Sequence, residues 1–149
     1  MKKLRLQANI ENLERLIQYV SGFAREHGFL QKRIREIELA TEEALVNIFN
    51  YAYPDKKDGK VEVRCKMDNY DHFTIDILDT GVPFDFKSLS GPDLDSAVHE
   101  RPIGGLGVFL IQKMADDVRY RRDGEKNILT LTFQKNISKR SQSNSKTLI

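Results

Sequence analysis

The sequence predicts one α+β domain, a two-layer sandwich in which a mostly antiparallel, mixed sheet is covered on one face by about three helices. Two observations predict this fold. Segments with helical periodicity occur beside paired strand-like segments, in the order strand, helix, helix, strand, strand, helix, strand, strand. Clustered strands beside helices are typical of α+β sandwiches, and 149 residues are enough for one domain with a proper core.

The composition is that of a globular protein that does not enter a membrane. Hydrophobic residues make up 40% of the chain and charged residues 31%. No window approaches the roughly 18 consecutive apolar residues of a membrane span. The N-terminal residues lack the apolar core of a signal peptide, so we expect a cytoplasmic protein. Cys65 is the only cysteine, which excludes an internal disulfide.

The charge balance separates a domain, residues 1–135, from a tail, residues 136–149. The tail contains Lys139, Arg140 and Lys146, four serines and no acidic residue, so we expect it to be disordered. Without the tail the net charge changes from +2 to −1, because 21 basic residues then face 22 acidic ones. A domain with this balance has no overall electrostatic signature of direct nucleic-acid binding.

The N-terminal part of the chain predicts a short strand and a scaffold helix. Residues 2–8 alternate around Leu4 and Leu6, as a strand does. Asn9 can cap the helix that follows, and Gly28 marks its predicted end. Apolar side chains recur in this helix at helical spacing: Leu13, Leu16, Ile17, Val20 and Phe23.

A central helix is predicted to start near Leu30 and to end before the helix-breaking Pro54. Its main part, residues 36–53, is apolar around most of its circumference. Four of its polar side chains form a stripe about 60° wide at roughly 100° per residue: Glu36, Glu43, Asn47 and Asn50. Glu38 and Glu42 lie on another side, as a solvated edge does. Burying an unpaired carboxylate is costly, so a polar stripe on a buried helix indicates a ligand or an ion. Polar stripes are usually solvated faces, however, and the helix alone leaves both interpretations open.

Two hairpins are predicted further along the chain. Residues 60–67 and 72–78 have strand character and are joined by a short polar segment. Residues 118–122 and 127–134 form the second pair, joined across Asp123 and Gly124.

The first hairpin leads into the sequence DTGVPFD. Asp79 stands at the end of a strand, Gly81 allows backbone torsions that other residues resist, and Pro83 fixes the exit of the loop. Residues 87–103 then predict a long flexible loop, and loops of this length in a compact domain are usually functional.

Three glycines, Gly104, Gly105 and Gly107, follow this loop and open a helical run over residues 106–114. Backbone amides at a helix start favour anions, because the helix dipole is positive there and glycine has no side chain to block the approach. The glycines are also compatible with close packing alone, so this motif by itself leaves the choice open.

Three motifs therefore occur in order: E-x-x-x-N at Glu43 and Asn47, D-x-G-x-P-F-D at residues 79–85, and G-G-L-G at residues 104–107. Together they resemble the ATPase fold of gyrase-type topoisomerases, mismatch-repair ATPases and sensor histidine kinases, the Bergerat-type or GHKL fold. The P-F-D continuation and Arg101 before the glycines most resemble the bacterial anti-sigma-factor serine kinases. The resemblance extends over residues 1 to about 135.

The resemblance implies a site for ATP and Mg²⁺. Asn47 would offer its amide oxygen to Mg²⁺, and Glu43 would accept or orient the proton of the attacking hydroxyl. Asp79 would accept a hydrogen bond from the exocyclic amine of adenine, while Gly81 would leave room for the base. A histidine often stands in this family where the chain has Tyr51, so the role of that position is not carried over.

The remaining implied roles concern the phosphates and the far side of the base. Gly105 and Gly107, together with Gly104, would cradle the phosphates on a closing lid, and Arg101 would approach them. Thr130 would lie on the sheet behind the base as a hydroxyl partner.

The resemblance implies an ATP-dependent protein serine/threonine kinase that phosphorylates a small antagonist protein and also sequesters a sigma factor. It is also compatible with a homodimer of this protein. The alternative is a nucleotide-gated binding module, in which ATP closes the lid and switches a partner surface with negligible turnover. Glu43 favours the kinase, because a binding switch needs no base.

Overall fold

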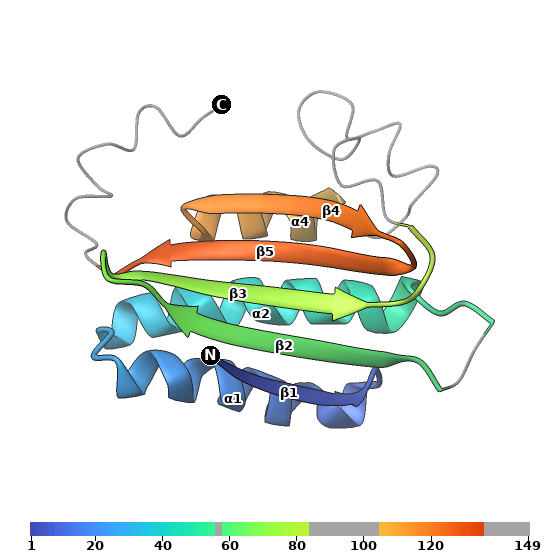
Figure 1. Ribbon diagram of the computed structural model, residues 1–149, viewed down its shortest axis with the longest axis horizontal. Coiled ribbons are helices and arrows are strands. Elements are labelled where there is room, and N and C mark those ends of the chain that lie inside the picture. Colours follow the sequence, from blue (N-terminus) through green and yellow to red (C-terminus); the bar gives the residue numbers. More distant parts are fainter. Residues whose placement is uncertain (56–57, 84–104, 136–149) are drawn as a thin grey trace.

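The computed structural model describes residues 1–55, 58–83 and 105–135. Five strands form one sheet, in the order β1-β2-β3-β5-β4. The strands are β1 (Lys2–Gln7), β2 (Lys60–Met67), β3 (His72–Asp79), β4 (Asp117–Asp123) and β5 (Lys126–Gln134). The α-helices of the described residues lie together on one face of the sheet (Figure 1), and they are α1 (Leu13–Glu26), α2 (Gln31–Tyr51) and α4 (Gly105–Met114).

This architecture confirms the predicted α+β sandwich and the predicted order of its elements. All four neighbouring strand pairs among the described residues are antiparallel. The predicted loop at 87–103 and the predicted tail at 136–149 lie outside the described residues. None of the helices in the described part of the chain is long and apolar enough to cross a membrane.

Apolar and polar side chains alternate along the strands, which explains why the helices cover only one face of the sheet. In β2 and β3 every second side chain is buried against the helices, including Val63, Ile75 and Ile77. Phe73 stacks on Phe23 of α1 with 5.1 Å between the ring centroids. Cys65 belongs to the same core, and its burial raises the pKa of the thiol to about 12, which identifies it as a packing residue.

The start of α1 differs from the prediction. Asn9 precedes a short 3-10 helix, η1 (Ile10–Asn12), and its side chain makes no capping hydrogen bond. Asn12 instead donates from Nδ2 to the Gln7 carbonyl oxygen at 2.9 Å, and α1 begins one residue later. The predicted end of the helix is confirmed, because Gly28 has a φ of 81°, a left-handed conformation that glycine adopts readily.

Arg33, in the first turn of α2, is fully buried and connects three elements. Its Nε donates to the Gln134 carbonyl oxygen at 3.0 Å, and its Nη1 donates to Glu36 Oε1 at 2.6 Å and to the Met114 carbonyl oxygen at 3.2 Å. Its Nη2 donates to the carboxylate of Asp116. Glu36, the first member of the predicted polar stripe, therefore contributes to a structural cluster that holds α2 against α4 and β5.

Candidate functional site

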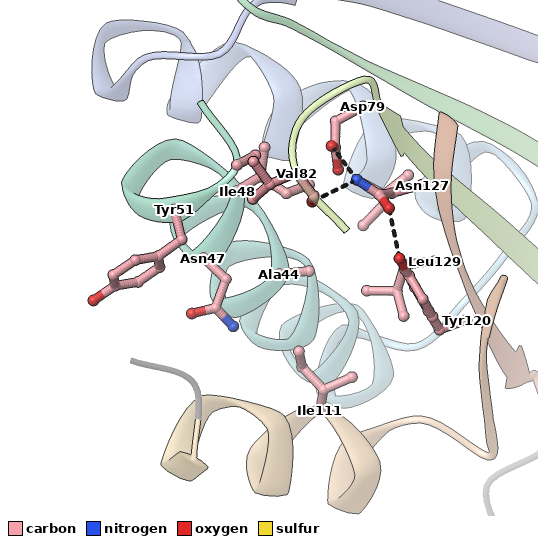
Figure 2. A pocket seen from close by; sticks show the side chains of 12 residues that line it. Ala44, Asn47, Ile48, Tyr51, Asp79, Val82, Ile111, Tyr120, Asn127 and Leu129 are labelled. Carbon is pink, nitrogen blue, oxygen red and sulfur yellow. Dashed lines mark hydrogen bonds between the residues drawn. The ribbon is translucent and has the colours of Figure 1, made fainter. Parts of the chain in front are cut away.

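An open pocket lies where the C-terminal half of α2 faces the sheet and α4 (Figure 2). Its walls are mainly apolar, with Ala44, Ile48, Ala52, Ile77, Val82, Ile111 and Leu129 as lining residues. Polar side chains line it in two groups, Asp79 with Asn127 and Tyr120, and Asn47 with Tyr51. An apolar pocket with a few convergent polar groups is typical of a site for a small organic ligand.

Asp79, the last residue of β3, is the buried acid of this pocket and is only 7% exposed. Its Oδ1 accepts two hydrogen bonds, from the backbone N–H of Gly81 at 2.8 Å and from Nδ2 of Asn127 at 2.7 Å. No donor among the described residues engages its other oxygen, Oδ2. Burial raises the pKa of Asp79, against the opposing effects of these two hydrogen bonds and of the Arg122 charge. The carboxylate is thus fixed in orientation with one acceptor left for a ligand.

Asn127 is the site residue that the sequence analysis missed. It is the direct register partner of Asp79 across the β3–β5 pair and is 4% exposed. Besides Asp79, its Nδ2 contacts the carbonyl oxygens of Val82 at 3.0 Å and Gly81 at 3.3 Å. A signal was available in the sequence, because strand alternation places Asn127 in the otherwise apolar series of Leu129, Leu131 and Phe133.

Two residues of β4 hold Asn127 in turn. Tyr120 donates from its hydroxyl to Asn127 Oδ1 at 2.5 Å, as Figure 2 shows, and Arg122 donates from Nη1 to the same oxygen at 3.0 Å. Arg122 also donates to the Gly81 carbonyl oxygen at 3.0 Å. The orientation of Asp79 is therefore set by a network from β4 and β5 and from the loop after β3.

Thr130 does not belong to this site. Strand alternation turns it to the uncovered face of the sheet, where its hydroxyl donates to Asp76 Oδ1 at 2.6 Å. The expectation that Thr130 lies behind a bound base is therefore wrong in this structure. The side chain of β5 beside Asp79 is that of Asn127, three residues earlier.

Gly81 is needed for a different reason from the one predicted. Its φ does not lie in the left-handed region. A Cβ at Gly81 would lie 2.1 Å from the Ala52 carbonyl oxygen, which accepts a 2.8 Å hydrogen bond from the backbone N–H of Val82. The space beside Gly81 is filled by the end of α2, so glycine permits this backbone contact and does not leave room for a base.

Glu43 and Asn47 lie one turn apart on α2, half-buried under the first turn of α4. A Cβ at Gly107 would lie 2.8 Å from Glu43 Oε1 and 3.6 Å from Asn47 Nδ2. The structure therefore brings the E-x-x-x-N pair together with the last glycine of the G-G-L-G motif. Gly105 is the first residue of α4, whereas Gly104 and Arg101 lie outside the described residues.

The described residues do not form a metal site of the kind that several acidic, histidine or cysteine side chains build together. They contain no cluster of three or more His, Cys, Asp or Glu residues that could hold a metal ion. Mg²⁺ in nucleotide sites needs only one or two protein oxygens, because phosphates and water supply the rest. Asn47 has an amide oxygen that could bind Mg²⁺ in this way, and its Nδ2 is the amide atom that lies toward Gly107 in the first turn of α4.

Comparisons with known proteins identify the family of this chain. The model of the histidine kinase-like ATPase domain family matches residues 6–133. A protein named serine-protein kinase RsbW from Bacillus cereus is 30% identical over 136 residues, which cover 88% of this chain and 83% of that protein. A protein of the same name from Oceanobacillus iheyensis is 34% identical over 104 residues, which cover 67% of this chain and 65% of that protein.

Solved structures with the same fold have low sequence identity. The RsbU and RsbW domains of a Mycobacterium tuberculosis protein match with a TM-score of 0.62 and 14% identity, over 90% of this chain and 32% of that one. The catalytic domain of histidine kinase ThkA matches with a TM-score of 0.56 and 14% identity, over 94% of this chain and 100% of that one. These likenesses concern the fold, and with the family match and the relatives they show that the chain belongs to the histidine kinase-like ATPase domain family, among relatives named serine-protein kinase RsbW.

Proposed function

We propose that this protein binds ATP between α2 and the sheet and phosphorylates a serine or threonine of a small antagonist protein. The observation that carries the proposal is Asp79, a buried carboxylate with one oxygen held by two donors and the other free among the described residues. The exocyclic amine of adenine is a donor that pairs with such an acceptor. Guanine would present a carbonyl oxygen there, and two acceptors repel each other.

Residues of α2 and α4 at and beside the pocket have distinct roles in this proposal. Asn47 would hold Mg²⁺ through its amide oxygen. Glu43 would accept or orient the proton of the attacking hydroxyl, one helical turn away. The glycines at the start of α4 would present backbone N–H groups to the phosphates, with the helix dipole favouring negative charge there. ATP supplies the phosphoryl group that is transferred.

The partners follow from the family resemblance and from the names of the relatives. The name serine-protein kinase supports a protein substrate with a serine acceptor. The resemblance adds a sigma factor, sequestered by this protein until its antagonist competes for it in the cytoplasm. The phosphate contacts proposed for Arg101 and Gly104 rest on the family resemblance alone.

A second candidate function is a nucleotide-gated switch with negligible turnover. The observation that favours it is the position of Gly107, where an added Cβ would lie 2.8 Å from Glu43 Oε1 and 3.6 Å from Asn47 Nδ2. A ligand bound at these side chains would displace or fix the first turn of α4, and a partner that touches α4 would respond to that change. In this case Glu43 would sense the ligand and would not act as a base.

The substitution Glu43→Gln separates the two functions, because it preserves the size and hydrogen-bonding capacity of the side chain and removes its basicity. We expect transfer of labelled phosphate from ATP to the partner to fall about 10²- to 10⁴-fold, the usual contribution of a general base. The affinity for ATP, measured by calorimetry, should change by less than about twofold, because binding does not use the proton. The partner is first identified by mass spectrometry of copurifying proteins.

The matched control is Glu42→Gln, an exposed neighbour on the same helix, which should leave both measurements unchanged. Transfer at the normal rate by Glu43→Gln would show that Glu43 is not the base. Tight ATP binding by the unmodified protein without any transfer to its partner would favour the switch.

A further inference from the structure

The uncovered face of the sheet, which is turned toward the viewer in Figure 1, is rich in basic side chains. Strand register and alternation place eight basic and four acidic residues on it. They are Lys3, Arg5, Lys60, Arg64, Lys66, Arg119, Arg121 and Lys126, with Glu62, Asp76, Asp117 and Asp123. The face thus has a net charge of +4, whereas residues 1–135 together have a net charge of −1.

A hollow of about 90 Å³ lies in this face, across the ends of β1, β2, β3 and β5. Its cationic lining residues are Arg5, Lys60, Arg64 and Lys126. The carboxylate of Glu62, the acid that borders it on this face, is bound by Arg64 Nε at 2.5 Å. The other acid that lines the hollow, Asp79, is in register with Val61 and Asn127, so its side chain belongs to the face that the helices cover. Three cations therefore surround the hollow without an ion pair of their own among the described residues.

Those three cations, Arg5, Lys60 and Lys126, are exposed and form no ion pair with any residue that the structure describes. Like charges gathered around a low-dielectric surface repel one another and create a positive potential. An anionic group in the hollow would relieve this repulsion. The floor includes the buried side chain of Leu78, so the site has an apolar base and a cationic rim.

We propose that this hollow and the surrounding basic face bind an acidic segment of a partner protein, with an Asp or Glu side chain in the hollow. The four acidic residues dispersed over the face argue against a nucleic acid, whose continuous phosphate backbone they would repel, whereas a polypeptide can present both signs of charge. A net charge of +4 also disfavours contact with the same face of a second copy.

The hollow lies on the reverse of the sheet from the pocket in Figure 2. Asp79, at the end of β3, lines both, but the three cations Arg5, Lys60 and Lys126 line only the hollow. The proposal therefore does not depend on the proposed function. Calorimetry of ATP binding to the same variants distinguishes a failure of the peptide-binding proposal from a failure of the proposed ATP-dependent function.

The test is the affinity of the full chain for a fluorescein-labelled oligoglutamate peptide, measured by fluorescence anisotropy at low salt. The variant with Arg5→Glu, Lys60→Glu and Lys126→Glu should bind at least about tenfold more weakly, because three attractive contacts become repulsive. The matched control reverses three exposed cations of the helices, Arg15→Glu, Lys32→Glu and Arg35→Glu. It has the same net charge and should lose less than about twofold in affinity.

A second variant, with Arg5→Gln, Lys60→Gln and Lys126→Gln, removes the three charges without adding acidic ones and is less prone to misfold. Its affinity for the peptide should also fall, but by a smaller factor. If the face variant and the helix control lost equal affinity for the peptide, net charge alone would explain the binding, and the proposal would be overturned. An oligodeoxynucleotide of equal charge that binds more tightly than the peptide would also overturn it, in favour of a nucleic acid. Self-association that only the face variants abolish would do so in favour of a second copy.

Discussion

Arg33 and Asp79 are buried charged residues at opposite ends of the contact between α2 and the sheet, and they are satisfied to different degrees. Each of the three guanidinium nitrogens of Arg33 donates to an acceptor of the protein, and the group lies 5.1 Å from the centre of the Phe133 ring. Asp79 has two donors on one oxygen and none from the described residues on the other.

The difference distinguishes a structural charge from a functional one. A buried ion whose partners all belong to the protein can only hold elements together, and its removal leaves other charges unpaired. A buried ion that is oriented but incompletely satisfied retains hydrogen-bonding capacity for a ligand, at a cost to the free protein. We therefore expect changes at Arg33 to affect stability and changes at Asp79 to affect ligand choice.

The largest expected effect is that of Arg33→Ala on stability. The substitution removes the ion pairs that Arg33 forms with Asp116 and Glu36 and leaves space in the core, so the free energy of unfolding should fall by about 3–5 kcal/mol. Urea unfolding followed by circular dichroism measures it. The control Arg35→Ala, at an exposed position of the same helix turn, should change stability by less than about 0.5 kcal/mol. A loss below about 1 kcal/mol for Arg33→Ala would contradict the structural role of the cluster.

The next effect is that of Asp79→Asn on nucleotide choice. The N–H of Gly81 and Nδ2 of Asn127 both point at Oδ1, so the new amide must keep its oxygen there and present its NH₂ group in place of Oδ2. The pocket then offers a donor where it offered an acceptor. Affinity for ATP should fall by about 1–3 kcal/mol in calorimetry, and GTP should gain relative to ATP.

The control for this change is Asp76→Asn, on the uncovered face of the sheet, which should leave ATP affinity unchanged. Equal affinity of the unmodified protein for ATP and GTP would contradict the adenine assignment. A parallel loss of stability in Asp79→Asn would show that the carboxylate is structural, as Arg33 is.

A smaller effect is expected from Gly107→Val in the first turn of α4, beside Glu43. The new Cβ would lie 2.8 Å from Glu43 Oε1, so the carboxylate or the first turn of α4 must shift. Affinity for ATP should fall by about 1 kcal/mol, and affinity for adenosine should not change, because only phosphates use these amides. Gly22→Val in α1, with open space around its Cβ, is the control. Equal losses for ATP and adenosine would indicate damage to the fold.

The smallest effect is a pH dependence that belongs to Asp79. Burial raises its pKa above the ordinary value of 3.8, so the folded state binds more protons than the unfolded state in the window above that value. The contribution of Asp79 to stability is therefore fully present below 3.8 and is lost as pH rises through the raised pKa. The unfolding free energy of Asp79→Asn, relative to the unmodified protein without nucleotide, should increase toward neutral pH. A difference that is constant with pH would contradict this.

The sequence by itself determined the parts of this protein that depend on local pattern. The α+β class and the order of elements follow from periodicity, which is a property of neighbouring residues. Glu43 and Asn47 had to share one side of a helix because they are four positions apart, and Asp79 had to stand where a strand ends. These predictions needed no knowledge of which segments meet.

Only the tertiary structure decided which side chains surround Asp79 and which buried charges have all their partners within the protein. Thr130 was assigned to the site in place of Asn127, because the side of β5 that faces the helices depends on its register with β3, and one step along a strand reverses the face. The need for glycine at position 81 comes from its contact with the distant end of α2. The burial of Arg33 requires its partners Asp116 and Gln134, which lie 83 and 101 residues away in the chain. Contacts over such separations arise from the packing of whole elements, which local pattern does not contain.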